Sequence, residues 1–433
     1  MEEVNNKAKS IFDRFTRKSS LRALRHRNFR LFFGGQSLSL IGTWMQRIAM
    51  AWLVYRLTNS PFLLGVVGFA GQIPTFLLPP FAGVLADRWD RRRMLLLTQS
   101  LLTIQALALA FLVLTGVVQV WHLVVLSLFF GTVFAFDIPT RQSFFVEMIG
   151  EKGDLGNAIA LNSSLVTGAR LLGPTIGGVL IGLLGEGACF LLNGVSYFPI
   201  IAALFAMKIP PKSMPQRRSR VWEGLKEGFA YVSGFAPVRS ILLLLALVSV
   251  MGMPYMVLLP VFAKKVLQGG PHAFGFLTAA GGLGALLGAV YLASRSTIIG
   301  LEKRILFAVI LFGGGLIAFS FSRILWLSLI FILITGFGQM VQMASSNTII
   351  QTIVDDDKRG RVMSFYAMSF VGMMPFGSLL AGFVASKIGT PATVTIGGIA
   401  CLIGAAVYAH KLPALRKMVN PIYEKMGITP ESY

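Results

Sequence analysis

The chain has 433 residues, of which 55% are hydrophobic and 13% are charged, and its mean hydropathy is +0.72. Soluble domains carry about 25% charged residues, so this composition excludes an ordinary soluble protein and indicates a chain that crosses a membrane many times. The formal net charge of +21 does not indicate nucleic-acid binding. In membrane proteins Lys and Arg collect in cytoplasmic loops and near anionic lipid.

The amino-terminal segment mixes acids, Asn and bases without an apolar core, so we expect no cleavable signal peptide. Within it, residues 11–27 form a basic amphipathic stretch that we expect to lie on the membrane surface. Cys189 and Cys401 both fall inside apolar segments, and the four histidines have no metal-ligand spacing. We therefore expect neither a disulfide nor a metal site nor a cofactor. The sequence has no Walker loop, so ATP is not expected to drive the protein directly.

Hydropathy divides the rest of the chain into segments of membrane length. A membrane helix needs roughly 20 apolar residues, and this criterion predicts an all-α polytopic protein with twelve spans. Their limits are residues 28–57, 61–86, 94–117, 121–143, 156–184, 187–207, 239–263, 272–294, 304–321, 324–350, 362–387 and 391–410.

The longest polar connection, residues 208–237, contains prolines and arginines followed by an amphipathic helical pattern. It predicts a division into two halves. The expected parts are an amphipathic amino-terminal segment (1–27), a six-helix half (28–207), a cytoplasmic linker (208–237), a second six-helix half (238–411) and a cytoplasmic tail (412–433).

Charge and internal repetition support this division. With twelve spans and the amino end inside, most of the 39 Lys and Arg residues fall on the inner side and only five fall outside, which favours a cytoplasmic location for both termini. The segment from Pro61 to Gly65 has a counterpart from Pro271 to Gly275, and each opens the second helix of its half. Four glycines recur in the second half at one constant offset: Gly156, Gly168, Gly178 and Gly185 match Gly360, Gly372, Gly382 and Gly389. A parallel repeat of two six-helix halves is the expected arrangement.

One apolar segment ends abruptly at residues 83–93, where four arginines and two aspartates follow within seven residues. So polar a turn must lie in water or in the headgroup zone, and its arginines favour the cytoplasmic side. The pattern Gly83-x-Leu-Ala-Asp87-Arg88-x-x-Arg91-Arg92, between the second and third spans, resembles the signature loop of the major facilitator superfamily. Asp90 stands where the family pattern usually has glycine.

Three further motifs resemble one branch of that superfamily. The glycine-rich stretch around Gly173 and Pro174 looks like an element associated with exporters. Together with the segment from Asp137 to Arg141 and with residues 359–364, it is similar to the branch that contains enterobactin exporters and macrolide efflux pumps. The resemblance implies a major facilitator fold, alternating access and proton antiport.

Ionisable and polar residues inside spans are costly and therefore candidates for function. Arg47, with Trp44 and Gln46 beside it, and Arg170 could form a cationic site for an anionic or phenolate-bearing substrate. The alternative is that both arginines are structural. The other candidate substrate-binding residues are polar groups expected to face inward, namely Asn162 in the first half and Tyr255, Gln339 and Gln342 in the second.

Asp137 is the one carboxylate well inside a span, and two interpretations are open. It could carry protons, or it could be a structural partner of Arg91 in a cytoplasmic latch, a role that Arg141 could fill equally. The resemblance implies that Gly83, Asp87, Arg88 and Arg91 act as a gate whose bonds form in one state and break in another.

Gly173 and Pro174 would permit close helix packing and a bend in the fifth helix.

These features predict a secondary active transporter of a bacterial inner membrane, not an enzyme. The leading hypothesis is a proton-coupled exporter of a medium-sized, acidic, aromatic molecule such as a siderophore. A multidrug or macrolide efflux pump is the nearest alternative, supported by methionines around the polar residues of the second half. A lipid flippase is a further alternative. We expect partners to be the substrate, protons and membrane lipid, and the protein to be a monomer.

Overall fold

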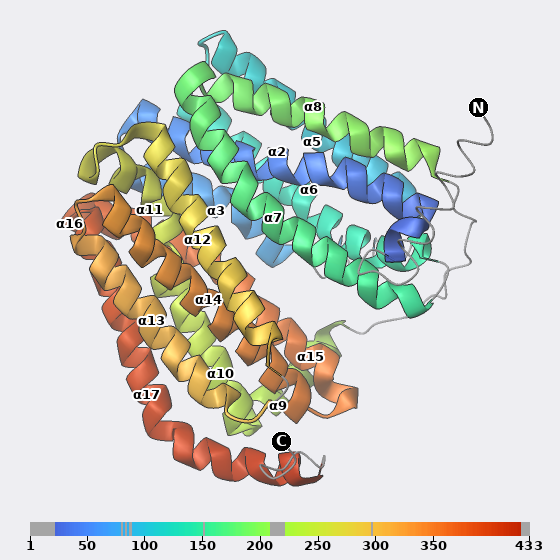
Figure 1. Ribbon diagram of the computed structural model, residues 1–433, viewed down its shortest axis with the longest axis vertical. Coiled ribbons are helices and arrows are strands. Elements are labelled where there is room, and N and C mark those ends of the chain that lie inside the picture. The colour runs from blue at the N-terminus through green and yellow to red at the C-terminus, as the bar shows by residue number, and fades with distance from the viewer. Residues whose placement is uncertain are drawn as a thin grey trace. The chain divides into compact units, whose positions relative to one another are not determined.

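The computed structural model describes residues 22–78, 81–82, 85, 89–149, 152–207, 221–295 and 298–425 (Figure 1). All regular secondary structure within these ranges is helical. The helices in chain order are η1 (Arg22–Arg25), α2 (Arg27–Thr58), α3 (Pro61–Leu77), α5 (Arg91–Leu114), α6 (Val120–Met148), α7 (Lys152–Leu184), α8 (Glu186–Ala206), α9 (Val221–Gly234), α10 (Ala236–Leu247), η2 (Val248–Gly252), α11 (Tyr255–Val261), η3 (Phe262–Val266), α12 (Gly270–Ala293), α13 (Leu301–Phe321), α14 (Leu325–Ile353), α15 (Asp356–Ala367), η4 (Met368–Gly372), α16 (Met374–Ile388) and α17 (Thr390–Lys425).

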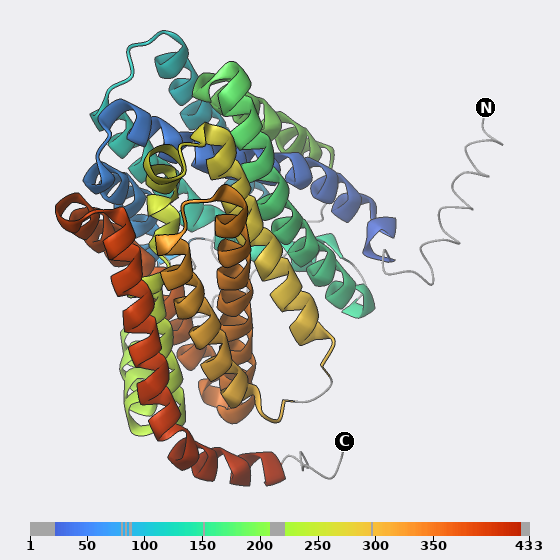
Figure 2. The ribbon, with the colours of Figure 1, turned by 60° about the vertical axis from the view of Figure 1, so that its left-hand side comes forward.

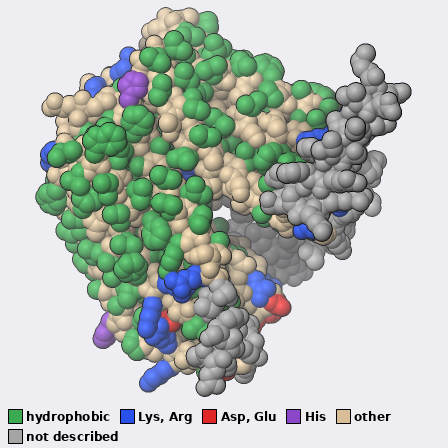
Figure 3. All heavy atoms as spheres, viewed as in Figure 1, with side chains coloured by type: hydrophobic (Ala, Val, Ile, Leu, Met, Phe, Trp, Pro, Cys, Tyr) green, Lys and Arg blue, Asp and Glu red, His purple; other side chains and the backbone are tan. Residues whose placement is uncertain are grey.

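Among the described residues, ten helical segments are long and apolar enough to cross a membrane. They correspond to the third to twelfth predicted spans. The first predicted span is the 32-residue helix α2, which includes four arginines and several polar side chains. The second is the shorter apolar helix Pro61–Leu77. The prediction of an all-helical membrane protein is confirmed, whereas the count of twelve spans stays a prediction. Figure 3 shows hydrophobic side chains over most of the visible helix surfaces.

The chain forms two compact units. The first unit comprises residues 1–49, 77–119 and 129–217, and the second comprises 50–76, 120–128 and 218–433. The boundary between them falls within α2 and within α6. The predicted six-helix halves, linker and tail therefore stay predictions about the chain.

In the first unit, glycines bring α2 close to its neighbours. A Cβ atom added at Gly35 would lie 2.7 Å from the Cα of Ile200 on α8, and one added at Gly42 would lie 2.5 Å from the side chain of Asn193. Near the start of α2 the core is aromatic, because Phe29 and Phe32 pack against Phe144 and Phe145 at the end of α6. These contacts fix the position of α2, the helix that carries Arg47.

In the second unit, α14 lies against α12 and α13 at glycine contacts. A Cβ atom added at Gly284 would lie 1.9 Å from the carbonyl oxygen of Leu333, and one at Gly338 would lie 2.6 Å from that of Ala308. Small residues let helix backbones approach closely where lipid supplies no hydrophobic driving force. Helix α14 is therefore enclosed on two sides, and its polar side chains from Ser328 to Ser346 are buried between helices.

Helix α9, which lies within the predicted linker, packs against α15 of the second unit. Glu227 forms an ion pair with Arg361, and the rings of Phe229 and Phe365 lie 6.4 Å apart. Burial, aided by the nearby Asp355 carboxylate, raises the pKa of Tyr231. The amphipathic pattern in this part of the sequence therefore corresponds to a helix that packs against α15.

Helix α17 continues well beyond a membrane span and bends before its last turns (Figure 2). Pro413 and Pro421 lie inside this region, and proline breaks the helical hydrogen-bond ladder. Both cysteines, Cys189 in α8 and Cys401 in α17, are free and buried.

Candidate functional site

Arg47 is surrounded by aromatic rings in the first unit. Its guanidinium carbon lies 4.9 Å from the ring centre of Trp44, 5.7 Å from that of Phe130 and 5.2 Å from that of Phe134. The guanidinium of Arg170 lies 5.8 Å from the same Trp44 ring. Cation–π contacts stabilise a guanidinium without neutralising its charge. Within the described residues no carboxylate pairs with Arg47, so the site keeps a positive charge available to an anion.

The residues around Arg47 are brought together by their spacing along the helices. Trp44 and Arg47 are three residues apart on α2, and Phe130 and Phe134 are four apart on α6, so each pair shares one helix face. Gly173 brings α7 against α2, since a Cβ atom added there would lie 2.5 Å from the Cβ of Trp44.

The neighbouring α7 residue, Pro174, lies inside the helix. Asn162 is half-buried on the same helix, about 12 Å before Arg170 along its axis. Of the candidates in the first unit, the structure thus brings Trp44, Arg47 and Arg170 together, with Gly173 as the contact point.

Gln46, the neighbour of Arg47, is committed to internal hydrogen bonds. Its Nε2 donates to Oε1 of Gln105 at 2.9 Å, and its Oε1 accepts from Nδ2 of Asn193 at 2.7 Å. All three amides are at most 4% exposed. Successive helix residues differ by about 100° around the axis, so fixing Gln46 inward fixes the direction in which Arg47 leaves α2.

The network continues to α2 through Tyr197. Asn193 donates to the Tyr197 hydroxyl, which lies 3.1 Å from Oγ1 of Thr43. Thr43 donates its own proton to the carbonyl of Ser39, so Tyr197 is the donor in the contact with Thr43. Every member of this buried network has a partner.

Asp137 is fully buried on α6, seven residues after Phe130. One carboxylate oxygen accepts hydrogen bonds from Thr98 at 2.9 Å and from Gln99 at 2.8 Å, and the other pairs with Arg141. The expected partner Arg91 instead binds Glu147 at 2.5 Å. In this structure Asp137 thus pairs with Arg141, one turn away on the same helix, and not with Arg91. The latch and proton-carrying roles of these residues stay predictions.

Most of the signature loop falls outside the described residues, including Gly83, Asp87 and Arg88. Its end is described. The Asp90 side chain accepts from the backbone N–H of Arg93 at 2.8 Å and caps the start of α5. Arg92 donates to the carbonyls of Leu204 and Phe205 at the end of α8, where a cation also offsets the helix dipole. The aspartate that departs from the family pattern thus has a local structural role.

The candidates of the second unit have a different environment. Tyr255, Gln339 and Gln342 are at most 5% exposed. The ring of Tyr255 lies 6.3 Å from that of Phe312 in an edge-on contact. Oε1 of Gln339 and Nε2 of Gln342 are buried without a hydrogen-bond partner. A buried unsatisfied polar group costs about 1–3 kcal/mol, so these two amides are not explained by packing.

Several residues of the site were not predicted. Phe130 and Phe134 were hidden in a uniformly apolar span, although their four-residue spacing ahead of Asp137 and Arg141 marks one face of α6. The amides of Gln99, Gln105 and Asn193 meet the criterion that selected Asn162, since each is a polar group inside an apolar span. The remaining missed residues are Thr98, Glu147 and Tyr197.

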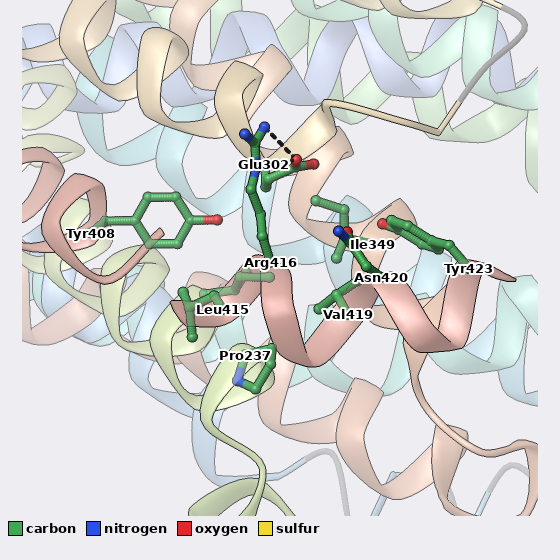
Figure 4. Close-up of a pocket in the computed structure, with 10 residues that line it drawn as sticks. Pro237, Glu302, Ile349, Tyr408, Leu415, Arg416, Val419, Asn420 and Tyr423 are labelled. Carbon is green, nitrogen blue, oxygen red and sulfur yellow. Dashed lines mark hydrogen bonds and ion pairs between the residues drawn. The ribbon is translucent and has the colours of Figure 1, made fainter. Parts of the chain in front are cut away.

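A separate, mostly apolar pocket lies where the end of α17 crosses α10, α13 and α14 of the second unit (Figure 4). Arg416 binds the carboxylate of Glu302 at 2.7 Å, and Tyr408 and Tyr423 lie on opposite sides of this pair. The side chains of Ile241, Ile349 and Leu415 supply apolar walls. The pair anchors the end of α17 to α13.

Comparison with solved structures shows the fold. The crystal structure of a bacterial homologue of the human lysosomal transporter Spinster superposes with a TM-score of 0.69, covering 88% of this chain and 96% of that one at 16% identity. Such a likeness shows that the two chains share a fold.

The sequence places the chain more narrowly. A family model for transmembrane secretion effectors matches residues 18–425, so the chain belongs to this family of the major facilitator superfamily. It is 27% identical to the staphyloferrin A transporter of Staphylococcus aureus, covering 87% of this chain and 94% of the relative. It is 27% identical to the multidrug efflux pump Tap of Mycolicibacterium fortuitum, over 86% and 92% of the two chains. It is 24% identical to the enterobactin exporter EntS of Shigella boydii, over 90% and 93%. The predicted superfamily and branch are confirmed, and so is the prediction of a transporter that is not an enzyme.

Proposed function

We propose that this protein exports an acidic, aromatic, siderophore-like molecule by proton-coupled alternating access. The observation that carries the proposal is the Arg47 site. An uncompensated guanidinium bordered by Trp44, Phe130 and Phe134, with Arg170 on the same indole, offers charge and flat apolar surface together. Catecholates and aromatic carboxylates present the complementary combination of anionic oxygen and ring.

The relatives support this substrate class and one alternative. Two of them are named for siderophores, staphyloferrin A and enterobactin, and one is named as a multidrug pump. Methionines such as Met340 and Met343 on α14 favour the multidrug alternative, because Met side chains adapt to ligands of varied shape. A flippase for anionic lipid would use the same two arginines and is the third possibility.

For proton coupling, Asp137 is the residue we propose to test. Its carboxylate accepts from Thr98 and Gln99 and pairs with Arg141, so a proton would have to displace an ion pair. Protonation would thus loosen the contacts that tie α6 to α5. We further propose that the protein acts as a monomer in the bacterial inner membrane with both termini in the cytoplasm, as its Lys and Arg distribution favours.

Proteoliposomes test the substrate and the coupling together. With 2,3-dihydroxybenzoate and enterobactin as anionic probes and catechol as the neutral one, the wild type should move the anions and show counterflow of protons. Arg47→Gln should reduce anion transport about tenfold or more, since charge-assisted hydrogen bonds are worth about 1.5–3 kcal/mol. Catechol should change much less. Equal losses of transport for the anionic and the neutral probes would instead indicate a folding defect, and Arg47 would then no longer support the proposal.

Two controls complete this experiment. Arg47→Lys keeps the charge and should retain part of the anion preference, although Lys lacks the planar fork. Asp137→Asn should abolish proton movement if Asp137 carries the proton, and unchanged exchange would exclude it from that role. A panel of drugs tested on a deletion strain, together with an assay for secreted catecholates, separates siderophore export from multidrug export.

A further inference from the structure

Three unpartnered polar groups cluster on α14 in the second unit. They are Oε1 of Gln339, Nε2 of Gln342 and Oγ of Ser345, and each is buried without a hydrogen-bond partner. The three residues are 5%, 2% and 0% exposed. Their spacing of three residues places neighbouring Cβ atoms about 5–6 Å apart, so the groups lie within reach of one small molecule.

This clustering is unusual for a helix interior. Buried polar groups in folded proteins almost always have partners, and each exception requires an explanation. Elsewhere on α14 the rule holds, since Thr335 donates to the carbonyl of Phe331 at 2.8 Å and Thr348 to that of Ala344 at 3.0 Å. The exceptions are therefore confined to the segment from Gln339 to Ser345.

The surroundings of the cluster define the chemistry that it would accept. Helix α14 contains no Asp, Glu, Lys or Arg from Leu325 to Ile353, and neither does α12 from Gly270 to Ala293. On α13, which also packs against α14, the charged residues Glu302, Lys303 and Arg304 all lie in the first turn. A charged group placed here would have no counterion on α12 or on α14 itself, at a large desolvation penalty. An amide oxygen, an amide N–H and a hydroxyl instead suit an uncharged group that both donates and accepts, such as an amide or a hydroxyl.

We propose that Gln339, Gln342 and Ser345 form a substrate subsite that binds an uncharged amide or hydroxyl group of the transported molecule. The subsite rests on the proposed function and extends it, because it assigns a second chemical requirement to the substrate. The molecule would carry an anionic aromatic part and, separately, neutral hydrogen-bonding groups. Ser345 is a new candidate for substrate binding, because it was not among the polar residues predicted from the sequence.

The first test uses stability and needs no substrate. Leu is apolar, somewhat shorter than Gln and requires no hydrogen bonds, so Gln339→Leu and Gln342→Leu should leave the unfolding temperature of the detergent-solubilised protein unchanged or raise it. The matched control is Gln105→Leu, which removes a buried amide that is hydrogen-bonded to Gln46 and should lower that temperature. An equal fall in all three variants would make the α14 amides structural and overturn the proposal.

The second test uses two uncharged probes, N-methyl-2,3-dihydroxybenzamide and methyl 2,3-dihydroxybenzoate, which differ in one amide or ester group. In proteoliposomes the wild type should transport the amide about fivefold better, the value of one hydrogen bond. Gln339→Leu should abolish this preference, and Ser345→Ala should reduce it. A preference that survives Gln339→Leu would overturn the subsite. If the wild type moves neither probe, the catecholate assignment fails, while the stability comparison still decides whether the α14 amides bind a ligand.

Discussion

One amide network of the first unit and the α14 amides of the second bury the same kind of side chain in opposite ways. In that network, the amides of Gln46, Gln105 and Asn193 satisfy one another, although Gln36 and Gln99 of the same unit each have a buried atom without a partner. In the second unit, the amides of Gln339 and Gln342 have atoms without partners. Both sets are at most 5% exposed. Residue type and burial therefore do not predict whether a buried amide is satisfied by its neighbours, and only the packed structure shows its hydrogen-bond partners.

The largest effect that would test this contrast is expected at Arg141. Arg141→Leu leaves the fully buried Asp137 without its cation, and breaking a buried pair costs about 3–5 kcal/mol. Unfolding in mixed detergent micelles measures the loss. The double variant Asp137→Leu with Arg141→Leu should lose much less, since no charge is left uncompensated. A double variant as unstable as Arg141→Leu would contradict this account of the first unit.

A smaller loss is expected at the centre of the amide network. Asn193→Leu removes donors to both Gln46 and Tyr197 and should destabilise the protein by about 1–3 kcal/mol. It should also weaken anion transport, because α2 is then free to turn Arg47 away from its aromatic neighbours. Leu191→Ala, at an exposed position on the same helix, is the control and should change neither quantity. Unchanged stability in Asn193→Leu would show that the hydrogen-bonded amides of this network contribute no more to stability than the unpartnered amides of α14.

Gly173→Ala tests the close packing of α7 against α2 in the first unit, because it should displace Trp44 in the Arg47 site. The new methyl group would collide with the base of Trp44, and overpacking costs about 1–3 kcal/mol. Anion transport should fall through displacement of the indole, with a change in its fluorescence. Gly168→Ala is the matched variant, because a methyl group there meets nothing within 4 Å. Equal effects of the two substitutions would argue against close packing at Gly173.

The smallest effect is expected at the end of α17. Arg416 is one-third exposed, so loss of its pair with Glu302 in Arg416→Ala should cost only about 0.5–1 kcal/mol. Limited proteolysis should then cleave the chain more readily after Leu412. A much larger loss of stability would show that this pair belongs to the core of the second unit.

The sequence allowed the membrane spans and the charged candidates to be predicted, since both depend on local composition. Arg47 and Trp44 could be paired because three-residue spacing places them on one helix face. The partner of Arg91 could not be predicted. Glu147 and Asp137 lie about 15 Å apart along the same helix, and the position of α5 against α6 determines which of them Arg91 reaches.

The partners of the buried amides were equally inaccessible. Gln46 was predicted to bind substrate, but its hydrogen bonds to Gln105 and Asn193 depend on three helices meeting at one level. In the proposed site Gln46 is better assigned to orienting α2.

Cys189 and Cys401, both buried, make the chain a favourable background for thiol chemistry. A single cysteine introduced at an exposed position, such as Leu38 on α2 or Ile310 on α13, would be the most accessible thiol among the described residues. Pairs of such cysteines carrying nitroxide labels would report distances between α2 and α13 in the lipid bilayer. Distances recorded with and without a proton gradient would follow the transport cycle directly, without removing a native residue first.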